Sequence, residues 1–223
     1  MNKSIILLSG GLDSLVCLGL CHKTHNIELA ITFDYGQKSV NNEIEASQKL
    51  AEYYQINHEV IELPFLAEIT NNSLTTDDEL PTQELFTKES AQSVWVPNRN
   101  GLFLNIAASY ADSYKFSHII IGANRDEAKT FPDNSKEFVE ATEEMFKYST
   151  IAQPKVYTPL INYSKNDIVA LALENNMPLE LTRSCYDNSQ KNCGICESCK
   201  HLKKALKYNN AERYIEELFE NVD

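Results

Sequence analysis

Four cysteines near the C-terminal end of the chain are spaced as metal ligands. They follow the pattern Cys185-x7-Cys193-x2-Cys196-x2-Cys199, and the two short spacings suit tetrahedral coordination of Zn²⁺ by thiolates. Four protein ligands leave no open coordination position, so the pattern favours a structural zinc over a zinc that activates a nucleophile. Disulfides could use the same cysteines, but a chain of 223 residues without a secretory signal does not need them.

A pair of glycines after the first apolar run offers a site for an anion. The sequence SGGLDS at Ser9–Ser14 joins that run to an amphipathic helical pattern. Paired glycines allow a tight turn whose N–H groups converge, and the helix dipole adds positive potential at the same point. The chain has no Gly-Lys-Ser/Thr after the turn and no Gly-x-Gly-x-x-Gly, which disfavours a Walker A loop and a dinucleotide fold.

Two further cysteines, Cys17 and Cys21, are four residues apart and therefore share one face of the first helix. Free cysteine commonly behaves as a small buried hydrophobe, and we predict that role for both. The five histidines lack ligand spacing, and none is assigned a catalytic role.

Apolar runs typical of strands alternate with helical patterns along the chain. Such alternation is typical of βαβ units, so we predict an α/β fold with a parallel sheet flanked by helices. The expected strands are Ser4–Ser9, Glu28–Phe33, Glu59–Leu63, His118–Gly122 and Val156–Tyr157. The expected helices are Asp13–Lys23, Asn42–Tyr54, Arg99–Tyr114, Lys136–Lys147, one that begins near Lys165 after the capping-box pair Ser164 and Asp167, and the C-terminal stretch Cys196–Phe219.

Two polar connections interrupt this alternation. Thr70–Ser93 is long and poorly periodic, which suits either a loop that lies over a site or a mobile insertion. Arg125–Ser135 follows a strand end, where ligands collect in open α/β sheets.

Charge and composition exclude several classes of partner. The net charge of −12 disfavours binding to long RNA or DNA, because such binding depends on clustered Lys and Arg. No apolar run approaches the length needed to span a bilayer. The apolar N-terminal stretch is short, runs into the glycine turn and lacks a cleavage site, so we expect a cytoplasmic protein.

The SGGLDS turn resembles the PP-loop of the ATP pyrophosphatase superfamily, whose fold is of the adenine nucleotide alpha hydrolase type. The resemblance implies that ATP with Mg²⁺ is split into AMP and pyrophosphate. It implies a nucleotide-binding domain over residues 1–180 and a zinc-binding helical segment over 181–223 that packs on the same domain. By the same resemblance the pyrophosphate is held by Ser9, Gly10, Gly11, Leu12, Asp13 and Ser14, with Asp13 helping to organise Mg²⁺.

Further motifs make the resemblance more specific. They are FDYGQ at Phe33–Gln37, VPNRNG at Val96–Gly101, Pro132-Asp133 followed by Glu137-Phe138, Pro159-Leu160 with Lys165 downstream, and TRSCY at Thr182–Tyr186. Together they resemble the 7-cyano-7-deazaguanine synthase (QueC) family. The resemblance implies conversion of 7-carboxy-7-deazaguanine, ATP and ammonia into a nitrile on the route to queuosine, by a homodimer that uses free ammonia.

Site roles follow from this resemblance and from side-chain chemistry. The planar fork of Arg99 suits a phosphate or carboxylate, and carboxylates such as Glu127 and Asp133 suit the paired N–H donors of a guanine-like edge. Plainer roles stay open, such as core packing for Phe33, a surface ion pair for Arg99 and a solvated Lys165. The residues implied are Phe33, Asp34 and Tyr35 for adenosine, Asn98, Arg99, Asn100, Glu127 and Asp133 for substrate, and Asp13, Ser14, Arg99 and Lys165 for catalysis.

One departure from the family pattern keeps other activities open. Where the family has a glycine-aromatic-Pro-Asp-Cys-Arg run, this chain reads TFPDNS at Thr130–Ser135, without that glycine, cysteine or arginine. A ligase that joins the deazaguanine acid to another amine, such as a protein terminus, is therefore an alternative. A tRNA sulfurtransferase and a nucleotide sensor without turnover are others, although the acidic charge disfavours RNA.

Overall fold

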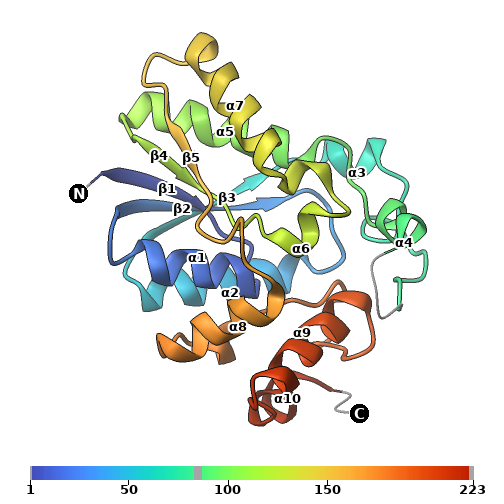
Figure 1. Ribbon diagram of the computed structural model, residues 1–223. Coiled ribbons are helices and arrows are strands. Elements are labelled where there is room, and N and C mark those ends of the chain that lie inside the picture. The colour runs from blue at the N-terminus through green and yellow to red at the C-terminus, as the bar shows by residue number, and fades with distance from the viewer. Residues whose placement is uncertain (1, 83–86, 221–223) are drawn as a thin grey trace.

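Five parallel strands form the central sheet of the computed structural model, which describes residues 2–82 and 87–220 (Figure 1). The strands are β1 (Lys3–Leu7), β2 (Asn26–Asp34), β3 (Asn57–Glu62), β4 (His118–Ile120) and β5 (Lys155–Tyr157). Their order is β3-β2-β1-β4-β5, and every neighbouring pair is parallel. The connections therefore diverge between β1 and β4, and open α/β sheets bind ligands outside the carboxyl ends of such strands.

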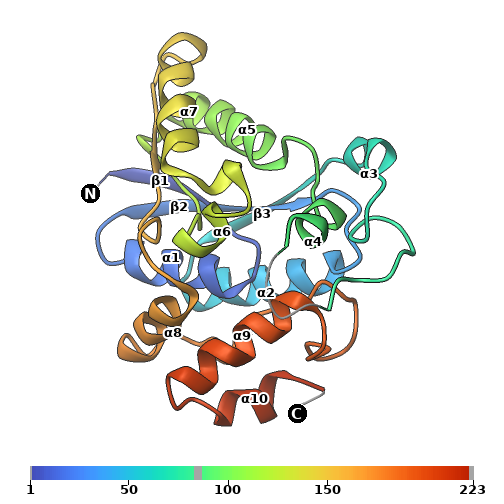
Figure 2. The ribbon, with the colours of Figure 1, turned by 45° about the vertical axis from the view of Figure 1, so that its right-hand side comes forward.

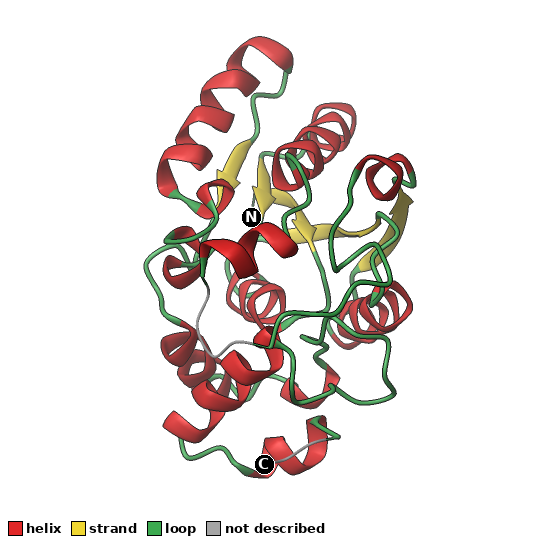
Figure 3. Ribbon diagram, turned by 90° about the vertical axis from the view of Figure 1, so that its right-hand side faces the viewer, coloured by secondary structure: helices red, strands yellow, loops and turns green. Residues whose placement is uncertain are grey.

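Helices cover both faces of the sheet, as Figures 1 and 3 show. Helices α5 and α7 lie on one face, whereas α1, α2 and α8 lie on the other, with α9 and α10 packed beyond α8. The helices are α1 (Leu12–Cys21), α2 (Val40–Tyr53), α3 (Phe65–Ile69), α4 (Lys88–Ser93), α5 (Arg99–Tyr114), α6 (Arg125–Ala128), α7 (Lys136–Ser149), α8 (Lys165–Glu174), α9 (Glu197–Tyr208) and α10 (Arg213–Leu218), with short 3-10 turns η1 (Pro132–Asn134) and η2 (Leu179–Leu181).

Two hydrophobic cores, one on each face, hold the layers together. Ile5 and Ile6 are adjacent in β1 and have no exposed surface, yet Ile5 packs in the core under α5 and Ile6 in the core under α1. This follows from the alternation of side chains along a strand, and it explains why β1 reads as a continuous apolar run. The core under α1 also contains Leu202 of α9, so the C-terminal segment shares this core with α1 and α8.

The predicted α/β class, with a parallel sheet flanked by helices, is confirmed. The capping box before α8 is confirmed as well: the Asp167 N–H donates to Ser164 Oγ at 3.3 Å, and the Ser164 N–H donates to Asp167 Oδ2 at 2.8 Å. Each predicted strand has a counterpart with ends shifted by a few residues. The division into residues 1–180 and 181–223 stays a prediction.

Three segments differ from the expectation. The polar connection Thr70–Ser93 contains α4, although part of it lies outside the described residues, and Arg125–Ser135 contains α6 and η1. The C-terminal stretch expected as one helical run is two helices, α9 and α10. The chain turns between them at Asn210, whose φ of 53° lies in the left-handed region and ends the first helix.

No helix in the described part of the chain is long and apolar enough to cross a membrane.

Candidate active site and metal centre

A cavity of about 290 Å³ lies at the carboxyl ends of the strands and gathers most of the predicted site residues. The glycine turn, the end of β2, the start of α5 and the α6–η1 segment all contribute to its walls. The predicted residues that line it are Ser9, Gly11, Leu12, Asp13, Ser14, Phe33, Tyr35, Arg99, Asn100, Glu127, Asp133 and Lys165. Residues from distant parts of the sequence therefore meet at one cavity.

Three predicted site residues do not line this cavity. Gly10 is buried behind the turn with a φ of +73°. The Asp34 carboxylate accepts a hydrogen bond from the Gly36 N–H at 3.0 Å and so closes a local turn. Asn98 precedes α5 with a φ of 53°, and its side chain lies so close to Gly101 that a Cβ there would meet Asn98 Oδ1 at 2.2 Å.

The polar connection after α3 reaches the wall of the cavity, in keeping with the first of the two interpretations of its sequence. Leu74 and the following Val94–Val96 segment line the cavity. The connection passes the start of α9 (Figure 2). There Ser90 Oγ donates to Glu197 Oε1 at 3.0 Å, and the Glu197 N–H donates to the Pro81 carbonyl at 2.8 Å. The C-terminal segment therefore supports one wall of the cavity.

The glycine turn is held in shape by its own serines and by the C-terminal segment. Ser14 Oγ donates to the Gly11 carbonyl at 3.0 Å. From the other end of the sequence, the Arg183 N–H donates to the Gly10 carbonyl at 2.8 Å, and Ser184 Oγ accepts from the Leu12 N–H at 3.4 Å. Sequence reasoning noted the TRSCY motif but missed these two contacts, because nothing local shows that it meets a turn more than 170 residues earlier.

Substitution of Gly10 by alanine is expected to destabilise the fold. The left-handed backbone costs a residue with a Cβ about 1–3 kcal/mol, and that Cβ would lie 2.8 Å from Ala46 Cβ and 2.9 Å from the Glu43 carbonyl oxygen. Gly11→Ala is the matched control, since a Cβ there meets nothing closer than 3.5 Å. Urea unfolding should show a lower midpoint for Gly10→Ala alone, and equal midpoints would contradict this account.

A cluster of three charged side chains lies beside the turn. Lys165 Nζ is 2.6 Å from Asp13 Oδ2 and 3.3 Å from Glu127 Oε1. The fully buried Asn124 positions both acids: its Nδ2 donates to Asp13 Oδ2 at 3.4 Å, and its Oδ1 accepts from the Glu127 N–H at 3.0 Å. Sequence reasoning did not single out Asn124, although an asparagine before a short acidic helix is a helix-cap signal.

Burial and charge set the protonation of this cluster. Burial raises the pKa of Asp13 to about 6, although the Lys165 ammonium opposes the shift. Burial would likewise raise the pKa of Glu127, but Lys165 and a hydrogen bond from Asn124 more than offset it and lower that pKa. Burial would lower the pKa of Lys165, yet the two carboxylates raise it. At neutral pH one ammonium therefore stands between two carboxylates.

Asp13 has an oxygen available for a further ligand. Its Oδ1 is buried and has no hydrogen-bond partner among the described residues. A buried carboxylate oxygen without a partner is costly, and oxygen ligands of this kind suit Mg²⁺. The donor set therefore fits a divalent cation beside the glycine turn.

Arg99 also lines the cavity and is held by Tyr35. Its Nη1 donates to the Tyr35 hydroxyl at 2.9 Å, and its guanidinium carbon lies 5.5 Å from the centre of the Tyr35 ring. Arg99 therefore presents a fixed guanidinium to the cavity.

Glu43, which sequence reasoning missed, also lines the cavity. Burial raises the pKa of its carboxyl despite hydrogen bonds from Ser39 and Gln37.

Aromatic rings form another part of the wall. Phe33 stacks on Phe103 with ring centres 3.9 Å apart and planes inclined by 9°, so one of its faces is covered by protein. Phe33 therefore belongs both to the core and to the cavity lining. The rings of Trp95 and Phe131 are nearly parallel, with centres 6.2 Å apart, and both line the cavity.

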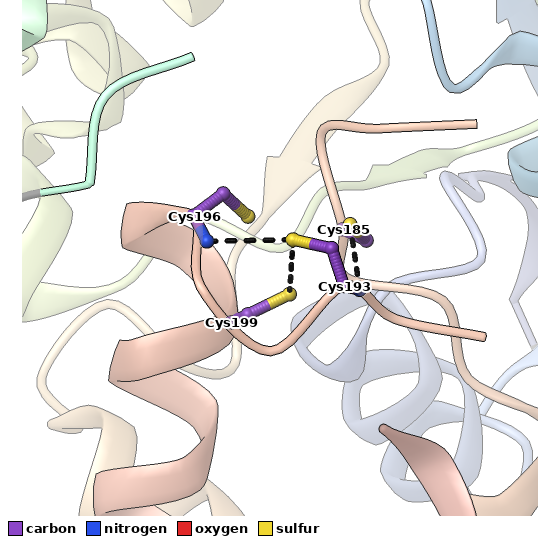
Figure 4. A group of neighbouring side chains, drawn as sticks. All are labelled: Cys185, Cys193, Cys196 and Cys199. Atoms are coloured by element: carbon purple, nitrogen blue, oxygen red, sulfur yellow. Dashed lines mark hydrogen bonds between the residues drawn. The ribbon is translucent and has the colours of Figure 1, made fainter. Parts of the chain in front are cut away.

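The four C-terminal cysteines converge on one point, as Figure 4 shows. Their sulfur atoms all lie within 4.8 Å of one another, all four residues are buried and none is in a disulfide. Cys193 Sγ and Cys199 Sγ are 3.9 Å apart, close to the roughly 3.8 Å that tetrahedral geometry requires for Zn–S bonds of about 2.3 Å. Backbone N–H groups of Cys193 and Cys196 point at neighbouring sulfurs, which stabilises thiolates. The cluster can therefore hold a metal ion.

Cys17 and Cys21 are buried small side chains, as predicted. Their exposed fractions are 0% and 1%, and burial raises the pKa of both thiols, that of Cys21 to about 12. Both remain protonated at neutral pH, and nucleophilic attack requires the thiolate. This argues against a sulfur-transfer mechanism that uses this pair.

Comparison with known proteins places the chain in a family. The model of the family described as "Queuosine biosynthesis protein QueC" matches residues 3–210. A 7-cyano-7-deazaguanine synthase of Carboxydothermus hydrogenoformans is 49% identical over 211 residues, which cover 92% of this chain and 98% of that protein. Another, of Methanosarcina barkeri, is 46% identical over 220 residues and covers 94% of each.

Similarity to solved structures is weaker. An NH3-dependent NAD synthetase from Campylobacter jejuni has a TM-score of 0.48 and 20% identity, and the match covers 80% of this chain and 66% of that one. A score at this level supports no conclusion about function. The family match and the two relatives, in contrast, span nearly the whole sequence, and the chain therefore belongs to the QueC family of queuosine biosynthesis proteins.

Proposed function

We propose that this chain uses ATP to convert 7-carboxy-7-deazaguanine and ammonia into 7-cyano-7-deazaguanine. The observation that carries the proposal is the Asp13–Lys165–Glu127 cluster beside the glycine turn, with Arg99 in the wall of the same cavity. The cluster offers Lys165 to a triphosphate and carboxylate oxygens to the Mg²⁺ that accompanies it, and the Arg99 guanidinium suits an acid. The name of the relatives supplies the product, 7-cyano-7-deazaguanine.

The reaction requires both binding places, one for the triphosphate and one for the acid. A carboxylate resists attack by ammonia, so its oxygen must first be adenylated while pyrophosphate leaves. The amides of the glycine turn and the Lys165 ammonium would stabilise the negative charge that develops on the phosphates. Ammonia then gives a primary amide. A second adenylation at the same cavity would make the amide oxygen leave with AMP, which yields the nitrile.

Site residues are given roles in keeping with their positions. The turn Ser9–Ser14 would hold the pyrophosphate, and Phe33, Asp34 and Tyr35 would surround the adenosine, with Asp34 acting through its backbone because its side chain closes a turn. Arg99 would bind the carboxylate, and Asp133 would receive the N–H donors of the guanine-like edge. The proposed auxiliary contacts come from Asn98, Asn100 and Glu127.

Two metals complete the proposal. Mg²⁺ would bind at Asp13, whose Oδ1 lacks a partner in the described structure, and would neutralise phosphate charge. Zn²⁺ would bind Cys185, Cys193, Cys196 and Cys199 as a structural ion, because the four thiolates leave it no open position. Its site adjoins Arg183 and Ser184, which hold the glycine turn.

We expect the enzyme to be a homodimer that acts on small molecules and does not bind nucleic acid. We also expect it in the cytoplasm, where thiols stay reduced.

A second candidate, ligation of the same acid to another amine, is favoured by one feature. Asn134, which stands where the family pattern has cysteine, is buried and lines the cavity beside Asp133. A changed side chain at this place could alter which amine reaches the activated acid.

Product mass separates the two candidates. The enzyme is incubated with 7-carboxy-7-deazaguanine, ATP and ammonium, and the products are analysed by mass spectrometry. The proposed function predicts the nitrile together with AMP. Absence of the nitrile, with AMP still formed when another amine is supplied, would favour the ligase, and binding of ATP without pyrophosphate release would indicate a sensor.

The rate of AMP formation is expected to fall as the pH drops through about 6. Since burial raises the pKa of Asp13 to about 6, its carboxyl loses its charge below that pH and can no longer pair with Lys165 or bind a cation. Asn124→Asp, which places a second acid next to Asp13 Oδ2, should move this limb of the pH–rate profile upward. An unshifted limb in that variant would assign the titration to another group.

The raised pKa of Asp13 affects the free energy of unfolding in the opposite direction to the rate: it lowers that free energy as the pH rises. The folded protein binds the Asp13 proton more tightly than the unfolded chain, whose carboxyl has a pKa near 3.8. This group therefore costs stability progressively as the pH rises from 3.8 to about 6.

A further inference from the structure

A second, smaller cavity of about 40 Å³ adjoins the main one on the side of α9. His201 and Leu202 of α9 line this side chamber without lining the main cavity. The other lining residues are shared by both, and they include Glu127, Lys165 and Tyr186. The side chamber is thus separated from the main cavity only by residues of the charged cluster and their neighbours.

We infer that the side chamber binds ammonia and delivers it to the adenylated acid. The inference rests on the proposed function, and it identifies where the second substrate is held. A main cavity of about 290 Å³ leaves no spare room once ATP and the deazaguanine acid are bound, since a pocket for one drug-sized ligand is typically about 300–1,000 Å³. A separate place for the amine removes the need for it to pass both of them.

The size of the chamber selects the amine. A volume of about 40 Å³ exceeds the roughly 10–15 Å³ of probe space that one water molecule needs, so ammonia, which is similar in size to water, has room there. The chamber is far smaller than the roughly 300–1,000 Å³ of pockets that hold drug-sized ligands, so the several residues of a protein terminus exceed it. The chamber therefore favours ammonia over the amine of the competing ligase.

The lining also matches the hydrogen-bonding capacity of ammonia. Ammonia accepts one hydrogen bond through its lone pair and donates three. Lys165 supplies a cationic donor, and Glu127 supplies a carboxylate acceptor that also attracts ammonium from solution. The hydroxyls of Ser184, Ser198 and Tyr186 can accept the remaining N–H groups.

Ammonia from the chamber attacks the adenylated acid and displaces AMP. The nitrogen lone pair forms a bond to the carboxyl carbon of the adenylated acid, and the bond between that carbon and the AMP oxygen breaks with its electron pair leaving on AMP. The proton released by nitrogen passes to the Glu127 carboxylate, which lines both cavities. Ammonia held next to Glu127 and Lys165 thus lies near both its target and its proton acceptor.

Two opposite substitutions at His201 test the inference. His201→Trp should narrow the chamber and raise the KM for ammonium by about 10–100-fold, the range that steric changes in a pocket produce, while the KM values for ATP and the acid stay unchanged. Lys204→Trp is the matched control, because Lys204 is an exposed residue of the same helix that does not line the chamber. Nitrile formation is measured against ammonium concentration, and zinc content verifies that each variant is folded.

His201→Ala should widen the chamber and admit methylamine, so that mass spectrometry detects the N-methyl amide, which the wild type should form at a rate at least about tenfold lower. This variant decides the question if His201→Trp fails to fold. Unchanged KM for ammonium in His201→Trp, or no N-methyl amide from His201→Ala, would overturn the inference. Absence of acid-dependent pyrophosphate release by the wild type would instead refute the proposed function, and the ammonia chamber with it.

Discussion

Replacement of Asp13 by asparagine should lower the rate of AMP formation by about 10²–10³-fold, the effect typical of losing one electrostatic contact in an active site. The side chain keeps its size but loses its charge, so the 2.6 Å pair with Lys165 is lost and the partnerless Oδ1 becomes a poor cation ligand. The measurement is acid-dependent AMP release at saturating ATP and Mg²⁺.

The fold should survive this change, because Lys165 retains Glu127 as a partner. Asp77→Asn is a matched control, since Asp77 is exposed on the long polar connection and should keep full activity. Near-normal turnover of Asp13→Asn, with its melting temperature unchanged, would reduce Asp13 to a favourable charge in the first turn of α1.

Replacement of Cys196 by serine should remove the metal and destabilise the protein. Loss of a structural metal site belongs with the few single changes that cost more than about 4 kcal/mol, and for a domain of this size such a loss lowers the melting temperature by roughly 10 °C. The zinc content and the melting temperature should therefore fall together. AMP formation should also decrease, because Arg183 and Ser184 lie beside the first cysteine ligand and hold the glycine turn.

Cys21→Ser is the comparison for this experiment. Cys21 is buried but lies outside the cysteine cluster, so that variant should retain one zinc per chain even if it loses some stability. A Cys196→Ser protein with full zinc content or an unchanged melting point would rule out a structural metal at the cluster.

The parts of the site that depend on local pattern could be predicted from the sequence. The turn at Ser9–Ser14 has its own glycines, the cysteine spacing restricts the metal geometry, and Ser164 with Asp167 marks the start of α8. In each of these cases the residues that interact are near one another in the chain. Local physics therefore predicts them without knowledge of the fold.

Contacts between distant segments could not be predicted in this way. Lys165 and Asp13 form their ion pair across 152 positions, and Asn124 reaches Asp13 across 111. Only the family resemblance suggested Lys165, and nothing suggested Glu43 as a cavity residue or Asn124 as the partner of Asp13. Their roles arise from the parallel sheet, which brings the segments after β1, β2, β4 and β5 to one edge.

The short helices were missed for a different reason. α4 and α6 are too short to show a hydrophobic period, so each appears in the sequence only as polar residues. Their caps are the usable signal: Thr87 and Ser90 form a capping box before α4, and Asn124 accepts two N–H groups at the start of α6.

The hydrogen bond from Arg183 to Gly10 joins the beginning of the chain to a residue made much later. During translation the nucleotide-binding turn emerges from the ribosome first, but its partner follows only after more than 170 further residues have been added. A growing or prematurely terminated polypeptide would thus lack a finished turn. If zinc occupies the cysteines, a cell that lacks zinc would make protein whose glycine turn is not held in place. Such protein would not cleave ATP.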